Sequence, residues 1–225
     1  MSRRRYVVLL LLPALACVWA GSGLLVSGLA SYQTQAYLTA WHRQGDQPSA
    51  LAWDIAQQAA QRAIDWYPGN SAEHWQRLGL VWQWRDWQAE QDDPEARHSR
   101  EQALLALRQA SALRPTWPRY WGELAYAKWQ LQTFDEEFTH ALTQAQLHGP
   151  GRIEVQQPLA QLYVLTPEQL NRQQWALLAQ AARFTLSWSQ SAAQQLTSLA
   201  QKTGQQQRLC MQLPGQPDGS MQGCP

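Results

Sequence analysis

One spacing of residues occurs three times in this chain, with successive steps of four, three and five positions, and proline closes each copy. Residues four and three apart lie on one face of a helix, and proline is common just beyond a helix end. A second pattern, Trp75, Leu78, Gly79 and Trp82, lies between the first two copies. Together the patterns predict repeated pairs of helices. The copies are Ala56, Ala60, Ala63 and Pro68; Ala103, Leu107, Ala110 and Pro115; and Phe138, Leu142, Ala145 and Pro150.

Helical spacing of apolar residues continues outside these segments, and no stretch alternates apolar and polar residues for long enough to be a strand. We therefore expect an all-α protein. Asn70, the box from Thr133 to Glu136 and the box from Thr166 to Gln169 are expected to cap the helices that follow them. Pro158 is expected to interrupt its helix. The expected helices cover 31–43, 49–66, 71–87, 92–113, 117–131, 133–148, 152–164, 166–184 and 189–202.

The N-terminal segment combines three arginines with a long uncharged stretch, residues 6–29. About 24 residues of helix, at ~1.5 Å each, are enough to cross a hydrocarbon core of ~30 Å. Arginines ahead of the apolar stretch favour a cytoplasmic N-terminus. We therefore expect residues 1–30 to be a basic end and single-pass anchor in a bacterial inner membrane, with a periplasmic helical domain at 31–203 and a tail at 204–225.

Two alternatives to an uncleaved anchor stay open. The stretch 6–16 fits the apolar core of a cleaved signal peptide, and the residues from Ala14 to Cys17 loosely resemble a lipoprotein cleavage site. Against both, Ala14 stands where such sites usually carry Leu or Val, and the apolar run continues well beyond Cys17. A mature protein that begins near Cys17 would contradict the anchor.

The other two cysteines, Cys210 and Cys224, both lie in the C-terminal tail. In an oxidising compartment they are expected to pair. Closing a loop of ~15 residues would stabilise the fold by roughly 3 kcal/mol in the chain-entropy description. The alternative is two free or unrelated thiols, and no histidine lies near enough in sequence to suggest a metal site.

Charge and motifs argue against several classes of protein. Beyond the N-terminal arginines, acidic residues slightly outnumber basic ones, so the chain lacks the basic stripe of a nucleic-acid binder. The five histidines are scattered, and both acidic clusters fall at expected helix starts, where capping explains them. No phosphate-binding glycine loop or serine-nucleophile motif occurs. We therefore expect no catalytic residue, no metal and no cofactor, and a binding protein rather than an enzyme.

The two spacing patterns resemble the tetratricopeptide (TPR) family, in which Trp-x2-Leu-Gly-x2-Tyr on one helix precedes Ala-x3-Phe-x2-Ala-x4-Pro on the next. Trp82 stands in the place of the tyrosine, Lys128 departs from the pattern in the second repeat, and residues 87–100 form an insertion. The resemblance covers roughly residues 49–150. It implies an antiparallel helix-pair solenoid, a fold that usually serves as a binding scaffold.

In TPR proteins the first helix of each pair lines a concave groove. Carried over position by position, the resemblance implies an aromatic and amide-rich groove suited to a peptide or a glycan. Under this hypothesis Trp84→Ala or Trp129→Ala should spare stability and abolish partner capture. The alternative is that the insertion or the C-terminal helices cover the groove and bury these two rings. The implied groove residues are Glu73, Gln76, Gln83, Trp84, Arg119, Tyr126, Trp129 and Gln130.

The whole chain resembles VpsP-type accessory proteins encoded in bacterial exopolysaccharide gene clusters. The resemblance lies in a short N-terminal anchor, a domain rich in Trp and Gln, the run 113–118 leading into Trp121, and the segment 134–138. It implies a role in exopolysaccharide biosynthesis or export through protein partners of that machinery, with glycan contact as an added expectation. The alternative is a generic envelope assembly or maturation factor, and third comes a glycan-binding or glycan-modifying protein.

Overall fold

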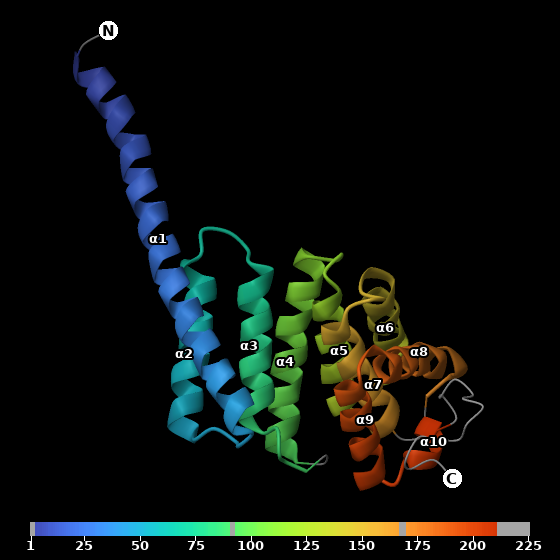
Figure 1. The fold of residues 1–225 in the computed structure, drawn as a ribbon. Helices are drawn as coiled ribbons and strands as arrows, with labels where there is room; N and C mark the ends of the chain where they lie inside the picture. The colour runs from blue at the N-terminus through green and yellow to red at the C-terminus, as the bar shows by residue number, and fades with distance from the viewer. Residues whose placement is uncertain (1–2, 91–92, 167–169, 211–225) are drawn as a thin grey trace. The chain divides into compact units, whose positions relative to one another are not determined.

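The computed structural model describes residues 3–90, 93–166 and 170–210, with side chains from Leu12 onward. Every regular element in these ranges is a helix (Figure 1), which confirms the predicted all-α class. The chain divides into two compact units, Met1–Leu113 and Arg114–Pro225. The predicted helical domain of residues 31–203 takes in parts of both.

Unit 1 contains four helices, of which the first is much the longest. They are α1 (Arg3–Gln44), α2 (Ala50–Trp66), α3 (Ala72–Arg85) and α4 (Pro94–Leu113). Helix α1 packs along α2, α3 packs against both α2 and α4, and α1 also reaches α3 (Figure 1). Short connections make successive helices antiparallel, so the turn between α2 and α3 lies at the opposite end of the unit from the turn between α1 and α2.

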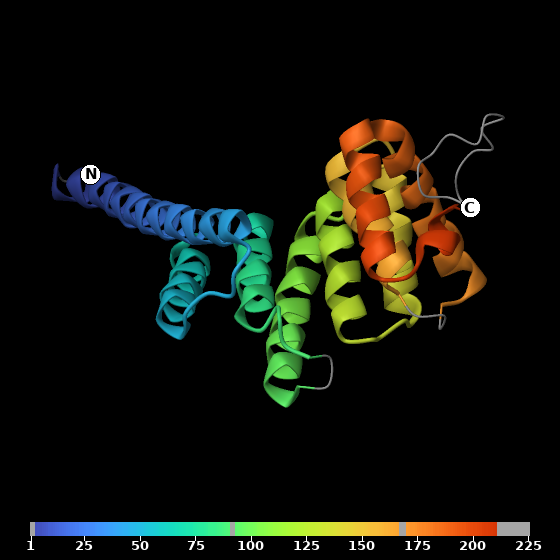
Figure 2. The ribbon, with the colours of Figure 1, turned by 60° about the horizontal axis from the view of Figure 1, so that its bottom comes forward.

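Helix α1 unites two segments that the sequence analysis separated, the predicted anchor and the predicted helix 31–43. Helical structure runs through Pro13 and Gly28 without a break. By length and composition α1 can cross a membrane. Figures 1 and 2 show its N-terminal half extending beyond the other helices of unit 1, while its C-terminal half lies against them.

The core of unit 1 gathers large aromatic rings around small residues. Trp53 stacks edge-on against Trp82, with ring centroids 4.8 Å apart, and its Nε1 donates to the Val81 carbonyl at 2.8 Å. Ala56 and Ala60 of the first spacing pattern are fully buried there. Their small side chains let neighbouring helices approach closely, which explains the pattern in physical terms. The core residues are Leu38, Trp41, Trp53, Ala56, Ala60, Leu78, Val81 and Ala106.

Gly79 marks the closest approach between α3 and α4. A Cβ atom there would lie 2.8 Å from Cγ of Leu107 and 3.3 Å from the carbonyl oxygen of Ala103. Leu107 and Ala103 belong to the second copy of the four-three-five spacing. The two sequence patterns therefore meet at one crossing between helices.

The helices of unit 2 pack against their neighbours along the chain. Helix α5 packs on α6 and α7, α8 contacts α6, α7 and α9, and α10 docks on α9 (Figure 2). Phe138, Leu142, Leu159 and Leu178 are fully buried and form its core. The helices are α5 (Pro118–Gln130), α6 (Glu136–His148), α7 (Ile153–Leu165), α8 (Arg172–Trp188), α9 (Gln190–Lys202) and α10 (Gln206–Cys210).

Several helix starts differ from the expected capping residues. Ser71, not Asn70, caps α3 by accepting from the His74 amide, and Asp135, not Thr133, caps α6 by accepting from the Phe138 amide. In each case the residue directly ahead of the first helical turn has the extended backbone that a cap requires.

Helix α8 also begins later than predicted. Its reciprocal capping box joins Asn171 and Gln174 instead of starting at Thr166; residues 167–169 of the predicted box lie outside the described range. Gln174 is held further by its Nε2, which donates to the Phe134 carbonyl at 2.9 Å, so a tertiary contact favours the later start. Pro158 lies inside α7 without ending it and faces solvent.

Candidate partner-binding site

The eight predicted groove residues fall on two helices in different units, four on α3 and four on α5. The four residues on α3 belong to unit 1, and the four on α5 belong to unit 2. Only Glu73 and Arg119 have exposed side chains, while Gln76 and Gln130 are buried. The groove role of these residues stays a prediction, and their individual contacts define what each group can do.

On α3, Glu73 lies where the helix meets α1. Its carboxylate pairs with Arg77 one turn along. The Arg77 guanidinium also donates to Oε1 of Gln35 at 3.2 Å and to the hydroxyl of Ser31, both on α1. The predicted groove residue Glu73 thus belongs to a polar cluster that ties α3 to α1.

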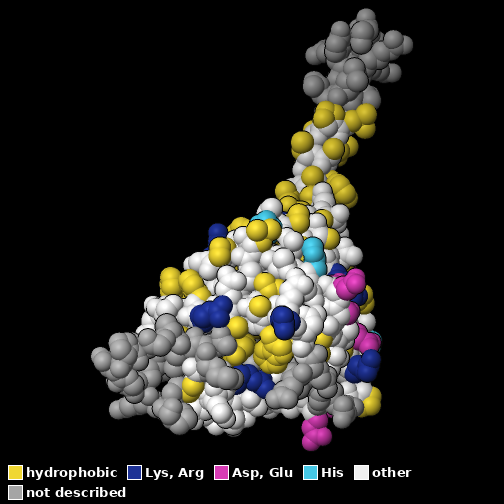
Figure 3. Space-filling view, turned by 90° about the vertical axis from the view of Figure 1, so that its right-hand side faces the viewer, with side chains coloured by type: hydrophobic (Ala, Val, Ile, Leu, Met, Phe, Trp, Pro, Cys, Tyr) yellow, Lys and Arg dark blue, Asp and Glu magenta, His cyan; other side chains and the backbone are white. Residues whose placement is uncertain are grey.

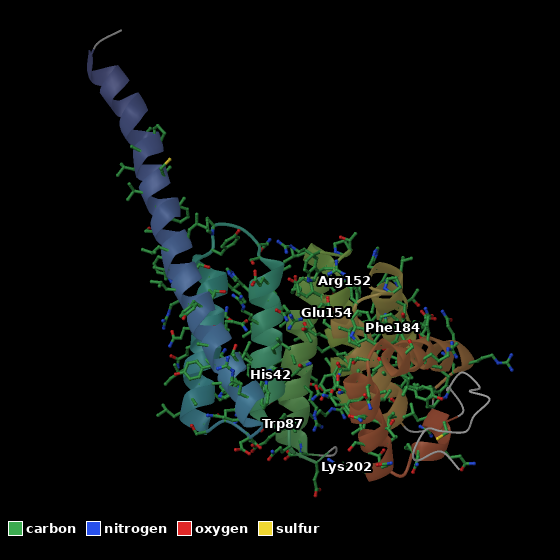
Figure 4. All side chains as sticks on the ribbon, in the orientation of Figure 1. His42, Trp87, Arg152, Glu154, Phe184 and Lys202 are labelled. Carbon is green, nitrogen blue, oxygen red and sulfur yellow. The ribbon has the colours of Figure 1, made fainter. Side chains whose placement is uncertain are left out.

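Trp84 packs against the C-terminal end of α1. Its ring centroid lies 6.1 Å from that of Trp41, 5.2 Å from that of His42 and 5.1 Å from that of Trp87. Figure 4 labels His42 at the end of α1 and Trp87 just after α3. The segments that cover Trp84 are therefore α1 and the start of the insertion, of which the sequence analysis anticipated the second.

The remaining amide on this helix, Gln83, is half-buried. Its Nε2 atom is shielded from solvent and makes no hydrogen bond to the described residues. A buried donor without a partner costs free energy, so this atom is a place where a bound group could add a favourable contact.

On α5, Tyr126 and Trp129 stack on each other, with ring centroids 5.5 Å apart and planes 29° apart. Both side chains are half-buried. The Trp129 Nε1 atom is shielded and has no hydrogen-bond partner among the described residues. Arg119 lies two turns earlier and pairs with Oε1 of Glu123 at 2.9 Å. Helix α5 thus presents a stacked aromatic pair and an exposed guanidinium, a combination that suits a peptide or a sugar ring.

Lys128, which departs from the repeat pattern, has a structural explanation. The side chain is 1 % exposed, and its Nζ atom lies 2.7 Å from Oδ2 of Asp135 and 2.6 Å from Oε2 of Glu137. Burial of Asp135 opposes its charged form, but the hydrogen bonds from Lys128 and the Phe138 amide outweigh this effect and lower the pKa of the carboxyl group. The three charges close the turn between α5 and α6, where Gln132 adopts a positive φ of 53°.

Between Leu12 and Leu29, α1 exposes a sleeve of large apolar side chains, visible in Figure 3 where the helix extends beyond unit 1. In water such a surface is unfavourable, and it marks a contact with lipid or protein. Cys17 lies in this sleeve as a free, exposed thiol. The sleeve comprises Leu12, Leu15, Val18, Trp19, Leu24, Leu25 and Leu29.

Sequence reasoning missed a second face of the same helix. Gly23, Ser27 and Ser31 recur every fourth position, and all three are buried. The Ser27 hydroxyl donates to the Ala63 carbonyl at 2.6 Å. The regular spacing of small residues inside an apolar stretch was the available signal, since it marks a face along which another helix can approach closely.

Two further expectations concern cysteines and metals. Cys210 takes part in a disulfide, whereas Cys224 lies outside the described residues, so their pairing stays a prediction. Within the part of the chain that the structure describes, no group of three or more His, Cys, Asp or Glu residues is placed to hold a metal ion.

No family model matches this chain, and no curated protein matches it. The likenesses to TPR proteins and to VpsP-type accessory proteins therefore stay predictions made from the motifs.

Proposed function

We propose that this protein is a membrane-anchored periplasmic scaffold of TPR-like type, which binds protein partners of a polysaccharide synthesis or export machine. One observation carries the proposal. Helix α1 is unbroken, with exposed large apolar side chains between Leu12 and Leu29 and a C-terminal part built into the core of unit 1 through Leu38 and Trp41.

This continuity favours an anchor that forms one rigid element with unit 1. A flexible linker would leave the domain free to turn, whereas a helix packed over several turns fixes its orientation relative to the membrane. Confinement to a membrane also raises the local concentration of a binding module for membrane-bound partners. A scaffold gains from both effects, because it acts by holding other proteins in place.

The TPR-like part of the proposal is supported by the pairing of helices. In unit 1, α1 pairs with α2 and α3 with α4, while α2 and α1 both contact α3. The crossing at Gly79 uses a residue type and position that the TPR pattern also uses. Helix pairs that stack in this way bury a continuous core and leave extended faces for binding.

For the partner surface we favour α5 over α3. Trp84 is engaged with Trp41 and His42, so its ring already has partners within the unit. On α5, by contrast, Tyr126 and Trp129 stack on each other two turns after the exposed Arg119, and the shielded Nε1 of Trp129 has no hydrogen-bond partner among the described residues. A peptide carbonyl or a sugar hydroxyl that reached this nitrogen would satisfy it.

Photocrosslinking in living cells tests the proposal. A photoreactive amino acid would replace Tyr126, Trp129 or, as a control in the same unit, Gln180, which is exposed on α8. We expect crosslinks from positions 126 and 129 to membrane proteins of polysaccharide assembly, and none of these from position 180. Crosslinks to other envelope proteins would overturn the polysaccharide setting, and identical products from all three positions would overturn the binding surface.

A further inference from the structure

We propose that residues 66–70, the last residue of α2 and the turn that leads toward α3, lie in the outer interfacial layer of the membrane that α1 crosses. Unit 1 would then rest on the lipid surface through this turn, with no stalk between them. The inference rests on the anchor in the proposed function, and it adds a lipid-contact surface that the anchor alone does not require.

The first step is the contact that fixes the height of the turn along α1. A Cβ atom on Gly23 would lie 2.8 Å from the carbonyl oxygen of Trp66, so the last turn of α2 touches the α1 backbone there. One turn further on, the Ser27 hydroxyl bonds to the Ala63 carbonyl. Two contacts one helical turn apart hold the end of α2 at the level of Gly23.

The second step is the length of α1 between its N-terminal end and this contact. From Arg3 to Gly23 the helix rises about 30 Å at ~1.5 Å per residue, which equals the thickness of a hydrocarbon core. With the arginines at the inner surface, Gly23 therefore reaches the outer boundary of the hydrocarbon. Trp66, whose carbonyl oxygen touches Gly23, then lies at the same boundary, and no length remains for a stalk.

The predicted span of residues 6–29 would place the turn deeper. Gly23 would then lie about 9 Å inside the hydrocarbon, together with Asn70 and the loop backbone. Non-helical backbone exposed to lipid cannot satisfy its hydrogen bonds. The structure thus favours a span of about the first 20 residues of α1, with Gly23 at the boundary.

The chemistry of the turn fits an interfacial position. Trp66 is 51 % exposed, and Tyr67 is half-buried beside it. These two residue types are enriched at membrane interfaces, because each combines an apolar ring with a polar group that stays hydrated. The Tyr67 ring packs edge-on against His74, with centroids 5.1 Å apart, which ties the turn to the start of α3.

The outer face of α1 extends the apolar surface past the turn. Leu25 and Leu29 are 65 % and 64 % exposed, and Leu29 lies about 9 Å beyond Gly23 along the helix. The interfacial layer is about 5–8 Å deep on each side of the hydrocarbon. Leu25, about 3 Å beyond Gly23, lies within such a layer, and Leu29 lies at its outer edge.

The surface is aromatic rather than basic. The residue next to Trp66 is Asp65, whose Oδ1 accepts from Nε2 of Gln61. We therefore expect the turn to enter the interface of zwitterionic and anionic membranes alike. Its aromatic rings would contact the boundary between acyl chains and headgroups, whatever the charge of the headgroups.

Spin-label accessibility tests the inference on the full chain in vesicles of phosphatidylcholine, with or without phosphatidylglycerol. The reporter is Gly69→Cys, where a Cβ makes only an ordinary contact of 3.6 Å with the Tyr67 ring. The matched control is Asp46→Cys, exposed in the turn at the other end of unit 1. Both variants carry Cys17→Ser, and a third sample is labelled at the native Cys17, which is free and exposed.

We expect the label at position 69 to meet oxygen more often than a water-soluble nickel chelate, and the label at position 46 to show the opposite preference. Equal exposure of both labels to the chelate, with position 17 in lipid, would overturn the seated turn and leave the anchor intact. Exposure of position 17 to the chelate would overturn the anchor itself. Loss of the preference in a Trp66→Ser, Gly69→Cys variant would identify Trp66 as the interfacial contact.

Discussion

The rings of Trp41 and Trp84 meet with their centroids 6.1 Å apart, joining the C-terminal end of α1 to the last turn of α3. Trp41 is 3 % exposed. The helix that is expected to cross the membrane therefore ends inside the aromatic core of the domain. This contact bears on Trp84, for which the sequence leaves two alternatives open, a place in a groove or burial under other segments, and the structure shows its ring in contact with α1.

We expect Trp84→Ala to lower the free energy of unfolding by about 2 kcal/mol, less than for a fully buried tryptophan because the ring is half-buried. The groove hypothesis taken from the sequence alone gives the opposite expectation of unchanged stability. Thermal unfolding of the detergent-solubilised chain measures the difference. Trp188→Ala, which removes a ring that is 52 % exposed, serves as the control and should change stability much less.

The contact of α1 with α2 predicts a contrast between two glycines on one helix. Gly23→Ala places a methyl group 2.8 Å from the Trp66 carbonyl oxygen and must push the helices apart, at a cost of about 1–3 kcal/mol. At Gly28 a Cβ meets nothing within 4 Å, so Gly28→Ala should be neutral or stabilise by up to about 1 kcal/mol. Unfolding in the same detergent compares the free energies of unfolding of the two variants. Equal effects would mean that α1 and α2 are not in contact at Gly23.

The crossing of α3 and α4 gives a second test of the same kind, away from the long apolar helix α1. Gly79→Ala should destabilise by about 1–3 kcal/mol, because its methyl group would overlap Leu107. Gly122→Ala on α5 is the matched variant, since its Cβ has no neighbour within 4 Å. A pair of chemical denaturation curves compares them. If Gly79→Ala proved as stable as the parent, the repeat pattern would not mark a tight crossing.

The buried ammonium of Lys128 predicts an asymmetry between its partners. Asp135→Asn combined with Glu137→Gln leaves this charge without either carboxylate and should cost about 3 kcal/mol. Lys128→Met should cost less, because both carboxylates are part-exposed and can be hydrated. Denaturant unfolding at neutral pH measures both variants, and an equal loss would contradict the asymmetry.

The same cluster predicts a dependence on pH. Because the pKa of Asp135 is lower in the folded chain, its charged form stabilises the fold above its unfolded value of about 3.9, and this contribution disappears as the pH falls through the lower, folded value. The stability gap between the parent and Asp135→Asn should therefore narrow steadily below about pH 4. Glu136→Gln, which neutralises the exposed carboxylate next along the chain, is the control; a gap that did not change with pH would contradict the assignment.

Local signals in the sequence predict much of the fold. The spacing of Ala56, Ala60 and Ala63 reflects helix contacts that depend only on residue size, and Pro68 and Pro115 follow helix ends, where proline is common because it has no amide hydrogen to donate. The continuity of α1 was missed, since the residues around Gly28 neither favour nor forbid a break. What keeps α1 helical there is its packing on Ala63 and Trp66, residues that lie far along the chain.

The candidate site is harder to predict for the same reason. Position in a repeat indicates which side a residue faces, but not whether another helix covers that side. Trp84 lies under α1 because Trp41 and His42 reach it, and nothing near Trp84 in sequence signals this. Lys128 shows the converse: its departure from the pattern is visible in sequence, but its partners become clear only in three dimensions.

The most direct test of the account is the sidedness of the two ends of α1 in intact cells. In a Cys17→Ser background, a membrane-impermeant maleimide would be applied to chains carrying Ser2→Cys or Asp46→Cys. The account predicts that position 46 is labelled in cells with a permeabilised outer membrane, while position 2 is labelled only after the inner membrane is broken. Labelling of position 2 from outside, protection of position 46, or a mature chain that begins near Cys17 would contradict it.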